Sequence, residues 1–411
     1  MHSTWTQFAG LPLVFNLVRS LKLDEIIQRV SIKARQYSAV QLILLIVTLR
    51  IIGSKRVSHV NQIDDLFLRD SLGFETLPDQ STINRFLGKI DKGTRRLLFT
   101  LSTKTLVEAG KVSGEILAID SHFIPYYGKF SPLAKKGYCA TRGKCVPGFK
   151  LVTVFDAQSG TKLAYRTLPG NVDPRRVLFR LLRDTFELID KRGVKYLLVD
   201  KGFYDEKVFT RLNAEKVYFV IPAKRYASII KALFSLDPEA KDELVFGSNV
   251  VETTYVLKKS KLQLRLIFKF CPQEDGKDKV FEFLTNSPVD EAAQIIEKYR
   301  KRWRLENAYA ELKNDWHIDK LPSSSFDKID TYIMLTLIAY NLSIYLKSHV
   351  KELVKARIST LRQKLINLSA AIKRAAGLVY VDAVFKEHLP RGRIKCGLSS
   401  INNHLSEVIY S

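Results

Sequence analysis

Three carboxylates in this chain occupy positions from which side chains often act chemically. Asp120 and Asp200 each end a short apolar run that is typical of a buried strand, and Glu306 lies in a charge-rich helical segment. Each has a plain structural explanation taken singly: a turn or cap for the aspartates, and an ion pair with Arg302 for the glutamate. Taken together, two aspartates on neighbouring strands and a glutamate on a packed helix can converge on one point.

The chemistry that such a carboxylate set favours is phosphoryl transfer. Three hard oxygen donors suit Mg²⁺ or Mn²⁺, which also take phosphate oxygens as ligands. Two such ions about 4 Å apart activate an attacking oxygen and stabilise a leaving one. The chain carries 66 Lys and Arg against 42 Asp and Glu, a net charge of +24. An acidic metal site inside a strongly basic chain is what nucleic-acid cleavage requires.

The segment around Glu306 has a regular arrangement of polar side chains. Tyr299, Arg302, Glu306 and Lys313 follow one another at intervals of 3, 4 and 7 residues. At about 100° per residue they fall on one face of a helix. A face packed into a core would be apolar, so this one is expected to meet solvent or substrate. The alternative is a surface salt-bridge face, which contributes little to stability and does not require the tyrosine.

Composition excludes several other classes of protein. An apolar fraction of 46% is ordinary for a folded chain. The most apolar stretch, Ala39–Gly53, is interrupted by polar residues and is shorter than the roughly 20 residues of a spanning helix, so a buried core helix is expected and no membrane anchor. The N-terminus lacks the features of a signal peptide. Four scattered cysteines indicate a reducing compartment, which favours a cytoplasmic location.

The first 112 residues are expected to be helical. Leu13–Val30 and Ala39–Gly53 carry apolar residues at helical spacing, and Pro78–Thr82 is a helix-start pattern. The short helix predicted at Ile83–Leu87 could enter a DNA groove, or could simply pack against the core. The sequence leaves these two roles open.

From Glu115 onward the pattern changes to strands and helices in alternation. Three strands are expected at 116–120, 149–156 and 161–168, followed by a helix at 173–191 and two further strands at 196–200 and 217–221. A β-rich insertion at about 226–279, a strand at 280–284 and a long helix at 290–316 complete the expected order. This pattern predicts an α/β fold.

Two basic segments are candidate DNA contacts. The glycine-rich segment Lys129–Lys150 holds six basic residues and no acidic one, and is interpreted as a DNA-facing loop rather than a solvated hairpin. Residues 346–411 are expected to form a basic helical region. There, Lys347, Lys351 and Lys355 would share a helix face that meets either solvent or phosphate.

These motifs resemble those of one family. The pattern Tyr299-x2-Arg302-x3-Glu306-x6-Lys313 is similar to the Y-R-E-K motif of insertion-sequence transposases with a DDE catalytic domain. Asp200-Lys-Gly-Phe-Tyr204 resembles that family's second-aspartate motif, and Ala118–Ser121 its first-aspartate strand. Ser81–Leu87 resembles its helical leader. The resemblance covers about residues 75 to 345.

The resemblance implies a ribonuclease H-like core, with a mixed sheet, in a catalytic domain at 113–345 that contains the β-rich insertion. It also implies metal-dependent cleavage of double-stranded DNA at terminal inverted repeats, followed by strand transfer into target DNA. Asp120, Asp200 and Glu306 would hold two Mg²⁺ or Mn²⁺ ions, while Tyr299, Arg302 and Lys313 would bind phosphates. Residues 1–112 would bind the repeats. A homodimer is expected on DNA.

One feature departs from the family pattern. Relatives that form a DNA hairpin intermediate stack a tryptophan of the β-rich insertion on a flipped base. The tryptophans of this chain lie at positions 5, 303 and 316, outside the insertion. Tyr255, Phe268 and Phe270 could stack in its place, although core positions suit them better. The sequence leaves the hairpin step open.

Three rival functions share some of these features. A nuclease of the same fold that cuts without joining would have the same carboxylates. A transposase-derived DNA-binding protein without activity would be expected to lack at least one of the three. A basic RNA-binding protein would account for the charge, but not for the polar face from Tyr299 to Lys313.

Overall fold

The computed structural model describes residues 4–30, 32–34, 36–63, 65–235, 249–273, 279–375, 378–383 and 408–410. Within these ranges the side chains of residue 4, of residues 303–307 and of residues beyond 371 are not described. By internal contacts the chain divides into two compact units. The first, here called the helical unit, comprises Met1–Val112, Phe123–Phe149 and Ala308–Ser411. The second, the sheet unit, comprises Ser113–His122 and Lys150–Asn307.

The helical prediction for the N-terminal region is confirmed. Its helices are α1 (Leu11–Ser20), α2 (Leu23–Arg29), α3 (Ala39–Ile51), α4 (Leu66–Ser71), α5 (Gln80–Leu87) and α6 (Lys92–Glu108), with a 3₁₀ turn at Val57–Gln62. Local capping fixes several starts. Ser38 and Gln41 form a reciprocal capping box on α3, and the Asp79 carboxylate accepts the Thr82 N–H at the start of α5 at 2.7 Å.

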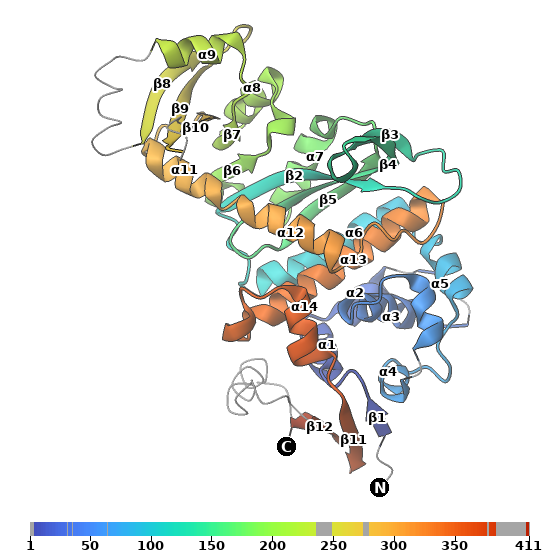
Figure 1. Ribbon diagram of the computed structural model, residues 1–411. Helices are drawn as coiled ribbons and strands as arrows, with labels where there is room; N and C mark the ends of the chain where they lie inside the picture. The colour runs from blue at the N-terminus through green and yellow to red at the C-terminus, as the bar shows by residue number, and fades with distance from the viewer. Residues whose placement is uncertain are drawn as a thin grey trace. The chain divides into compact units, whose positions relative to one another are not determined.

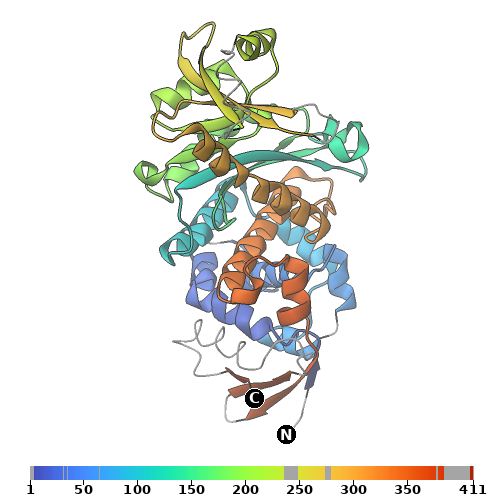
Figure 2. The ribbon, with the colours of Figure 1, turned by 60° about the vertical axis from the view of Figure 1, so that its left-hand side comes forward.

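A long apolar helix, α13 (Phe326–Ser348), forms the centre of the helical unit. It packs against α3, α5, α6 and α1, and both ribbon views show this orange helix among blue and cyan ones (Figures 1 and 2). Its length and composition alone would allow it to cross a membrane, and 83% of its apolar window is buried inside the protein.

The C-terminal region begins with helical turns and continues with strands. After α13 come the 3₁₀ turn Lys351–Leu353, α14 (Ile358–Leu361), a π-helical turn (Arg362–Ile366), β11 (Ala370–Ala375), β12 (Leu378–Ala383) and β13 (Val408–Tyr410). The expectation of helix up to residue 411 is therefore wrong for these three strands. The reason is tertiary, because β11 pairs antiparallel with the N-terminal strand β1 (Thr4–Thr6).

The predicted lysine stripe is also wrong. Helix α13 ends at Ser348, so Lys347, Lys351 and Lys355 do not share a helix. Lys347 is buried, and its ammonium group donates to the carbonyl of Ala356 at 2.7 Å. This lysine satisfies a backbone acceptor instead of facing phosphate.

Most strands of a nine-stranded mixed sheet belong to the sheet unit, whereas the short hairpin strand β3 of the same sheet belongs to the helical unit. The strand order of the sheet is β3-β4-β2-β6-β7-β10-β9-β8, with β5 paired to β4. The bounds are β2 (Ile116–Pro125), β3 (Lys135–Cys139), β4 (Lys144–Asp156), β5 (Lys162–Pro169), β6 (Tyr196–Val199), β7 (Phe219–Pro222), β8 (Val250–Val256), β9 (Gln263–Cys271) and β10 (Lys279–Thr285). Strand β2 pairs in parallel with β6, and β6 with β7, whereas β10 runs antiparallel to β7.

This arrangement confirms the predicted α/β core with a mixed sheet. Leaving aside β3, Asp120 lies on the first core strand and Asp200 directly follows the fourth, β6. Helices α7 (Leu178–Phe186), α8 (Glu206–Ala214) and α9 (Ala227–Phe234) connect or flank the strands. The predicted β-rich insertion contains α9, β8 and β9, and β9 pairs with β10 so that the insertion extends the sheet. Phe268 is fully buried there, which leaves it no face for stacking on a base.

The predicted helix at 290–316 is interrupted. It forms α11 (Ala292–Arg300) and α12 (Trp303–Asn314), with a tight turn between them. In that turn the N–H groups of Lys301 and Arg302 donate to the carbonyls of Lys298 and Tyr299, three residues earlier. Arg302 therefore lies at the junction of two helices and not inside one.

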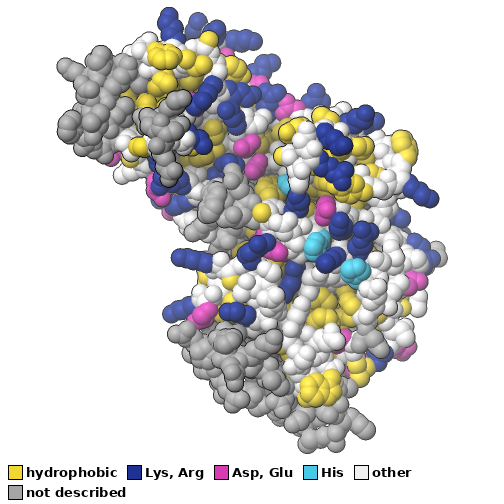
Figure 3. All heavy atoms as spheres, in the orientation of Figure 1, with side chains coloured by type: hydrophobic (Ala, Val, Ile, Leu, Met, Phe, Trp, Pro, Cys, Tyr) yellow, Lys and Arg dark blue, Asp and Glu magenta, His cyan; other side chains and the backbone are white. Residues whose placement is uncertain are grey.

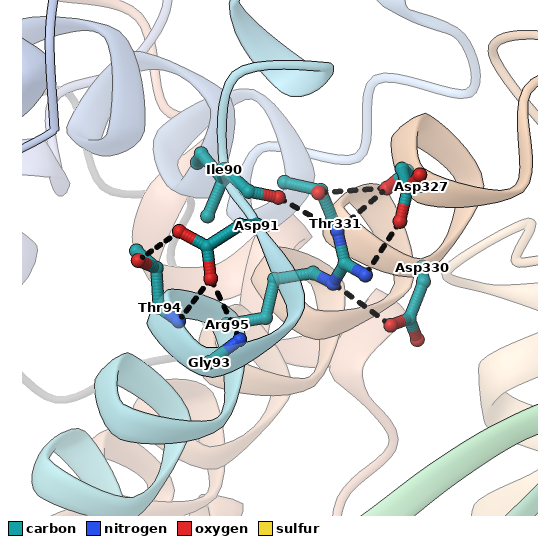
Figure 4. Close-up of polar contacts among 8 residues, drawn as sticks. All are labelled: Ile90, Asp91, Gly93, Thr94, Arg95, Asp327, Asp330 and Thr331. Atoms are coloured by element: carbon teal, nitrogen blue, oxygen red, sulfur yellow. Dashed lines mark hydrogen bonds and ion pairs between the residues drawn. The ribbon is translucent and has the colours of Figure 1, made fainter.

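One buried cation joins two helices of the helical unit (Figure 4). Arg95 of α6 is 2% exposed. Its guanidinium lies 2.7 Å from the Asp327 carboxylate and 2.9 Å from that of Asp330, both in α13. It also donates to the carbonyl of Ile90 at 2.6 Å. The network thus links α13 to the beginning of α6.

Replacing this cation should destabilise the protein strongly. We expect Arg95→Leu to lower the free energy of unfolding by about 3 kcal/mol, because it removes a buried cation that contacts the Asp330 carboxylate and the Ile90 carbonyl. The matched control is Lys104→Ala in the same helix, whose ion pair with Glu108 is 3.7 Å long and exposed. That change should cost less than about 1 kcal/mol. Chemical denaturation measures both, and equal losses would contradict the role given to Arg95.

Candidate active site

The candidate site begins with the register of two parallel strands. Strands β2 and β6 pair so that Ile119 lies opposite Val199. The next residue on each chain segment is an aspartate, Asp120 or Asp200. Paired residues of parallel strands direct their side chains to the same face of a sheet. Asp120 lies in the middle of β2, which continues to Pro125, and not at the end of a strand as expected, although the buried run does stop at Ile119.

One guanidinium group contacts both aspartates. The Nη1 atom of Arg302 lies 3.5 Å from Oδ2 of Asp120 and 3.4 Å from Oδ1 of Asp200. The side chains of Arg302, Asp120 and Asp200 are 13%, 15% and 31% exposed. Two carboxylates brought this close repel each other, and a shared cation offsets that repulsion. The structure therefore brings together three of the predicted site residues.

The turn after β6 fixes the direction of the Asp200 carboxylate. Asp200 caps the 3₁₀ turn Lys201–Phe203, and its Oδ2 accepts the Gly202 N–H at 3.0 Å. A Cβ atom at position 202 would lie 3.2 Å from that same oxygen, a contact tighter than usual. Phe203 is fully buried and anchors the turn. The sequence Asp-Lys-Gly-Phe thus combines a carboxylate, a glycine that makes room for it and an anchor.

A second arginine holds the segment on the far side of this turn. Arg175 lies in the 3₁₀ turn Pro174–Val177, which packs against the turn Lys201–Phe203. Its guanidinium forms an ion pair with Asp173 and another with Asp205, the latter at 2.6 Å. Hydrogen bonds from Arg175 hold the pKa of the Asp173 carboxyl below its usual range.

Asp205 connects that ion pair to the next helix. Its carboxylate accepts the Lys207 N–H at 2.8 Å and so caps α8. Sequence reasoning missed Arg175 and Asp205 as supports of the site. The proximity of Asp205 to Asp200 along the chain was the available signal, but the contact with Arg175 spans about 30 residues and has no local pattern.

Tyr299 approaches the same two aspartates from α11. Its hydroxyl donates to the carbonyl of Val199 at 3.5 Å, and its ring packs against Phe283 at 5.0 Å between centroids. Burial raises the pKa of the Tyr299 phenol, the Arg302 guanidinium opposes the rise, and the charges of Asp200 and Asp120 add to it. Tyr299 thus stays protonated at neutral pH and supports the end of β6.

The other two predicted site residues, Glu306 and Lys313, make no described contact with Asp120 or Asp200. Glu306 lies in α12 of the sheet unit, and its side chain is outside the described part of the structure. Lys313 belongs to the helical unit, where its ammonium group donates to the Thr141 hydroxyl at 3.0 Å. Thr141 lies in the turn between β3 and β4. These strands pair antiparallel, so the segment Lys129–Lys150 contains a hairpin and is not the loop expected from its glycines. Lys313 therefore contacts this segment, here called the basic hairpin.

The described residues fit part of a site for divalent cations. Asp120 and Asp200 are partly buried carboxylates that converge on one positive group, and oxygen donors of this kind suit Mg²⁺ or Mn²⁺. Among the side chains that the structure describes, no group of three His, Cys, Asp or Glu residues is close enough to hold a metal ion. A third carboxylate would have to come from elsewhere, and Glu306 is the sequence-predicted candidate.

Comparison with known proteins supplies a family match. Residues 112–342 match the sequence profile described as the transposase DDE domain. Among solved structures, a piggyBac transposase in a synaptic complex with hairpin DNA, determined by cryo-EM, matches with 14% identity and a TM-score of 0.47. The match covers 88% of this chain and 81% of that one, a similarity that does not establish a shared fold. No curated protein matches the chain.

The ion pairs of Arg302 should contribute measurably to stability. We expect Arg302→Leu to lower the free energy of unfolding by about 1–2 kcal/mol, because Asp120 and Asp200 would lose the cation that they share. The control is Arg300→Leu, two residues away, whose pair with Glu297 is 62% and 68% exposed. Thermal and chemical unfolding without divalent cations measure both variants. A loss no larger than that of the control would mean that the shared cation adds no net stability.

Proposed function

Because the chain belongs to the transposase DDE domain family, we propose that it is the DNA transposase of an insertion sequence. The proposed reaction is cleavage of double-stranded DNA at terminal inverted repeats, followed by joining of the freed ends to target DNA. The observation that carries the proposal is the convergence of Asp120 and Asp200 on Arg302, within the residues that match the family. A pair of carboxylates built into neighbouring strands suits phosphoryl transfer better than binding alone.

Asp120, Asp200 and Glu306 are the proposed ligands of Mg²⁺ or Mn²⁺, with two ions as the proposed number. Divalent cations held there would supply positive charge to the reacting phosphate and make a water or a 3′-hydroxyl a better nucleophile. The chain supplies the fixed frame. The β2–β6 register places two carboxylates side by side, and Gly202 and Arg175 hold the turn that orients Asp200.

Arg302 has a role of its own in this proposal. In the structure its guanidinium neutralises the aspartates, and the same planar donor group suits a phosphate of the substrate. We propose that the Arg302 guanidinium contacts a DNA phosphate when divalent cations are held by the two carboxylates. Tyr299 fixes the strand end through Val199, and Lys313 adds a point charge beside the basic hairpin. Tyr299 and Lys313 are also proposed to contact phosphates of the DNA.

DNA is the proposed partner on grounds of charge. A net charge of +24 favours a polyanion, and the binding should weaken steeply with added salt. The helical N-terminal region is proposed to bind the inverted repeats; in α5, Ser81 and Arg85 are exposed while Ile83 and Phe86 are buried. Two ends must meet for joining, so a homodimer on DNA is proposed. The proposed location is the cytoplasm, on the nucleoid.

A nuclease that cuts without joining is the second candidate function. It would use the same carboxylates, and nothing in their arrangement separates it from a transposase. The presence of products joined to target DNA distinguishes the two.

The deciding experiment is cleavage of labelled DNA that carries the inverted repeats flanking the chain's own coding sequence. We expect cuts at the repeat ends with Mg²⁺ and none with a chelator. Glu306→Gln, Asp120→Asn and Asp200→Asn should each lower the rate by about 100-fold or more, because each removes a charge that holds the cation. DNA binding by the three variants, measured in parallel, should be largely retained.

Two outcomes would count against this proposal. If wild type bound the repeats without cutting under any metal condition, a DNA-binding remnant of a transposase would describe the protein better. If Glu306→Gln cut as fast as wild type, Glu306 would not be a ligand, and the third carboxylate would have to be sought elsewhere in the sheet unit.

Gly202 offers a separate test of the turn that orients the Asp200 carboxylate. We expect Gly202→Ala to slow cleavage by about 10- to 100-fold, because the added methyl group displaces the Asp200 carboxylate that lies 3.2 Å away. The matched control is Gly193→Ala, where a Cβ atom meets nothing within 4 Å. Both changes should leave the fold intact by circular dichroism. Equal cleavage rates in the two variants would contradict the role given to Gly202 in orienting the Asp200 carboxylate.

A further inference from the structure

A pocket of about 430 Å³ lies within the helical unit, apart from the residues assigned to cleavage. It is bounded by the segment Tyr126–Lys129, by Arg56, and by the loop Asp319–Ser324 between α12 and α13. A volume of this size falls in the range of about 300–1,000 Å³ that small ligands and single nucleotides occupy. The nature of its lining indicates which ligand it suits.

The charged part of the lining is mainly positive. Arg56, Lys129 and Lys320 line the pocket together with a single carboxylate, Asp319. Lys320 forms an ion pair with that carboxylate at 3.5 Å, whereas Arg56 and Lys129 form no ion pair with any residue in the described part of the chain. Two cations are thus available for an anionic ligand.

The electrostatic field around the pocket is positive, as is most of the charge in its lining. His317 lies two residues before Asp319. Burial lowers the pKa of the His317 imidazole, the charges of Lys55 and Arg50 lower it further, and the charge of Asp319 opposes them. A positive field disfavours a protonated imidazole and favours a bound phosphate.

Two tyrosines form the aromatic part of the lining. The Tyr126 hydroxyl is hydrogen-bonded to Ser324, and its ring meets Phe149 edge-on at 5.9 Å. Gly128 leaves room for this ring, because a Cβ atom at that position would lie 2.4 Å from the Tyr126 hydroxyl. Tyr127 is 56% exposed, and the Arg142 guanidinium lies over its ring at 4.7 Å. A ring held in this way can stack on a planar base.

The pocket continues onto an exposed surface of the same character. The hairpin of β3 and β4 exposes Tyr138 to 64%, and Phe130 before it is 86% exposed. Lys135, Lys136 and Lys144 of the hairpin are exposed as well. Figure 3 shows basic and apolar side chains intermixed over the part of this face where Figure 1 labels β3 and β4. Exposed aromatics among cations are typical of surfaces that bind single-stranded nucleic acid.

We propose that this pocket binds one unpaired nucleotide of DNA, with its base against Tyr127 and its phosphate near Arg56 and Lys129. A paired nucleotide cannot enter, because its base is stacked and hydrogen-bonded inside the duplex. The hairpin surface binds the neighbouring single-stranded nucleotides. This assignment rests on DNA as the partner in the proposed function, and adds that the protein distinguishes an open end of DNA from a fully paired one.

The test compares two labelled DNAs by fluorescence anisotropy with the full chain and no divalent cation. One is a blunt duplex, and the other is the same duplex with a short single-stranded thymidine extension. We expect the extended DNA to bind about tenfold more tightly, since a stacked base contributes substantially to such binding. Tyr127→Leu should abolish this preference and leave the binding of blunt DNA unchanged.

The matched control for that variant is Phe234→Leu, an aromatic residue of the sheet unit that is 76% exposed. It should keep the full preference. Arg56→Gln should reduce the preference severalfold, which gives a second variant in case Tyr127→Leu does not fold. A 5-iododeoxyuridine in the extension should photo-crosslink to the peptide that contains Tyr126 and Tyr127.

Equal affinity of wild type for the two DNAs would overturn the inference, and so would a crosslink confined to other peptides. If an acidic peptide displaced both DNAs and no preference were seen, the surface would bind anions in general and not a nucleotide. Because binding is measured without metal, these results do not depend on cleavage. Glu306→Gln should keep the preference for extended DNA even where it abolishes cutting.

Discussion

The register between β2 and β6 is the constraint on which the rest of the site depends. With Ile119 opposite Val199, the next residues are Asp120 and Asp200, and both carboxylates point to one face of the sheet. A shift of one residue in either strand would turn one carboxylate to the opposite face. The apolar residues before each aspartate are fully buried, so the hydrophobic core itself fixes this register. The chemistry is thus set by the burial of residues that take no part in it.

Bringing two negative charges together has an energetic cost, and the structure meets it with nearby donors. The break between α11 and α12 lets Arg302 contact both aspartates. The Gly202 N–H donates a hydrogen bond to the other carboxylate oxygen of Asp200. Arg175 secures the same turn through Asp205. These contacts orient the two carboxylates before any cation or DNA binds.

The large positive charge of the chain is only partly available to a polyanion. Arg50, Arg95, Lys347 and Arg362 are all buried, and each donates to backbone carbonyls or to a side chain of another element. Such cations satisfy helix ends and join helices that are distant in sequence. One group of the cations that remain exposed lies on the hairpin of β3 and β4, beside exposed aromatic residues.

The sequence by itself determined the order of the core strands from β2 to β10. It also determined the helix starts at Ser38 and Asp79, and the two aspartates with the turn that follows the second. Short apolar runs and capping residues act locally, so these features need no distant partner. Tertiary structure alone decided the strand β11, which needs β1 as its partner, and the support of Asp205 by Arg175. It also turned Lys347 inward and placed Arg56 and Tyr127 in the lining of one pocket. These features depend on contacts between residues far apart in the chain, and no local pattern of residues encodes them.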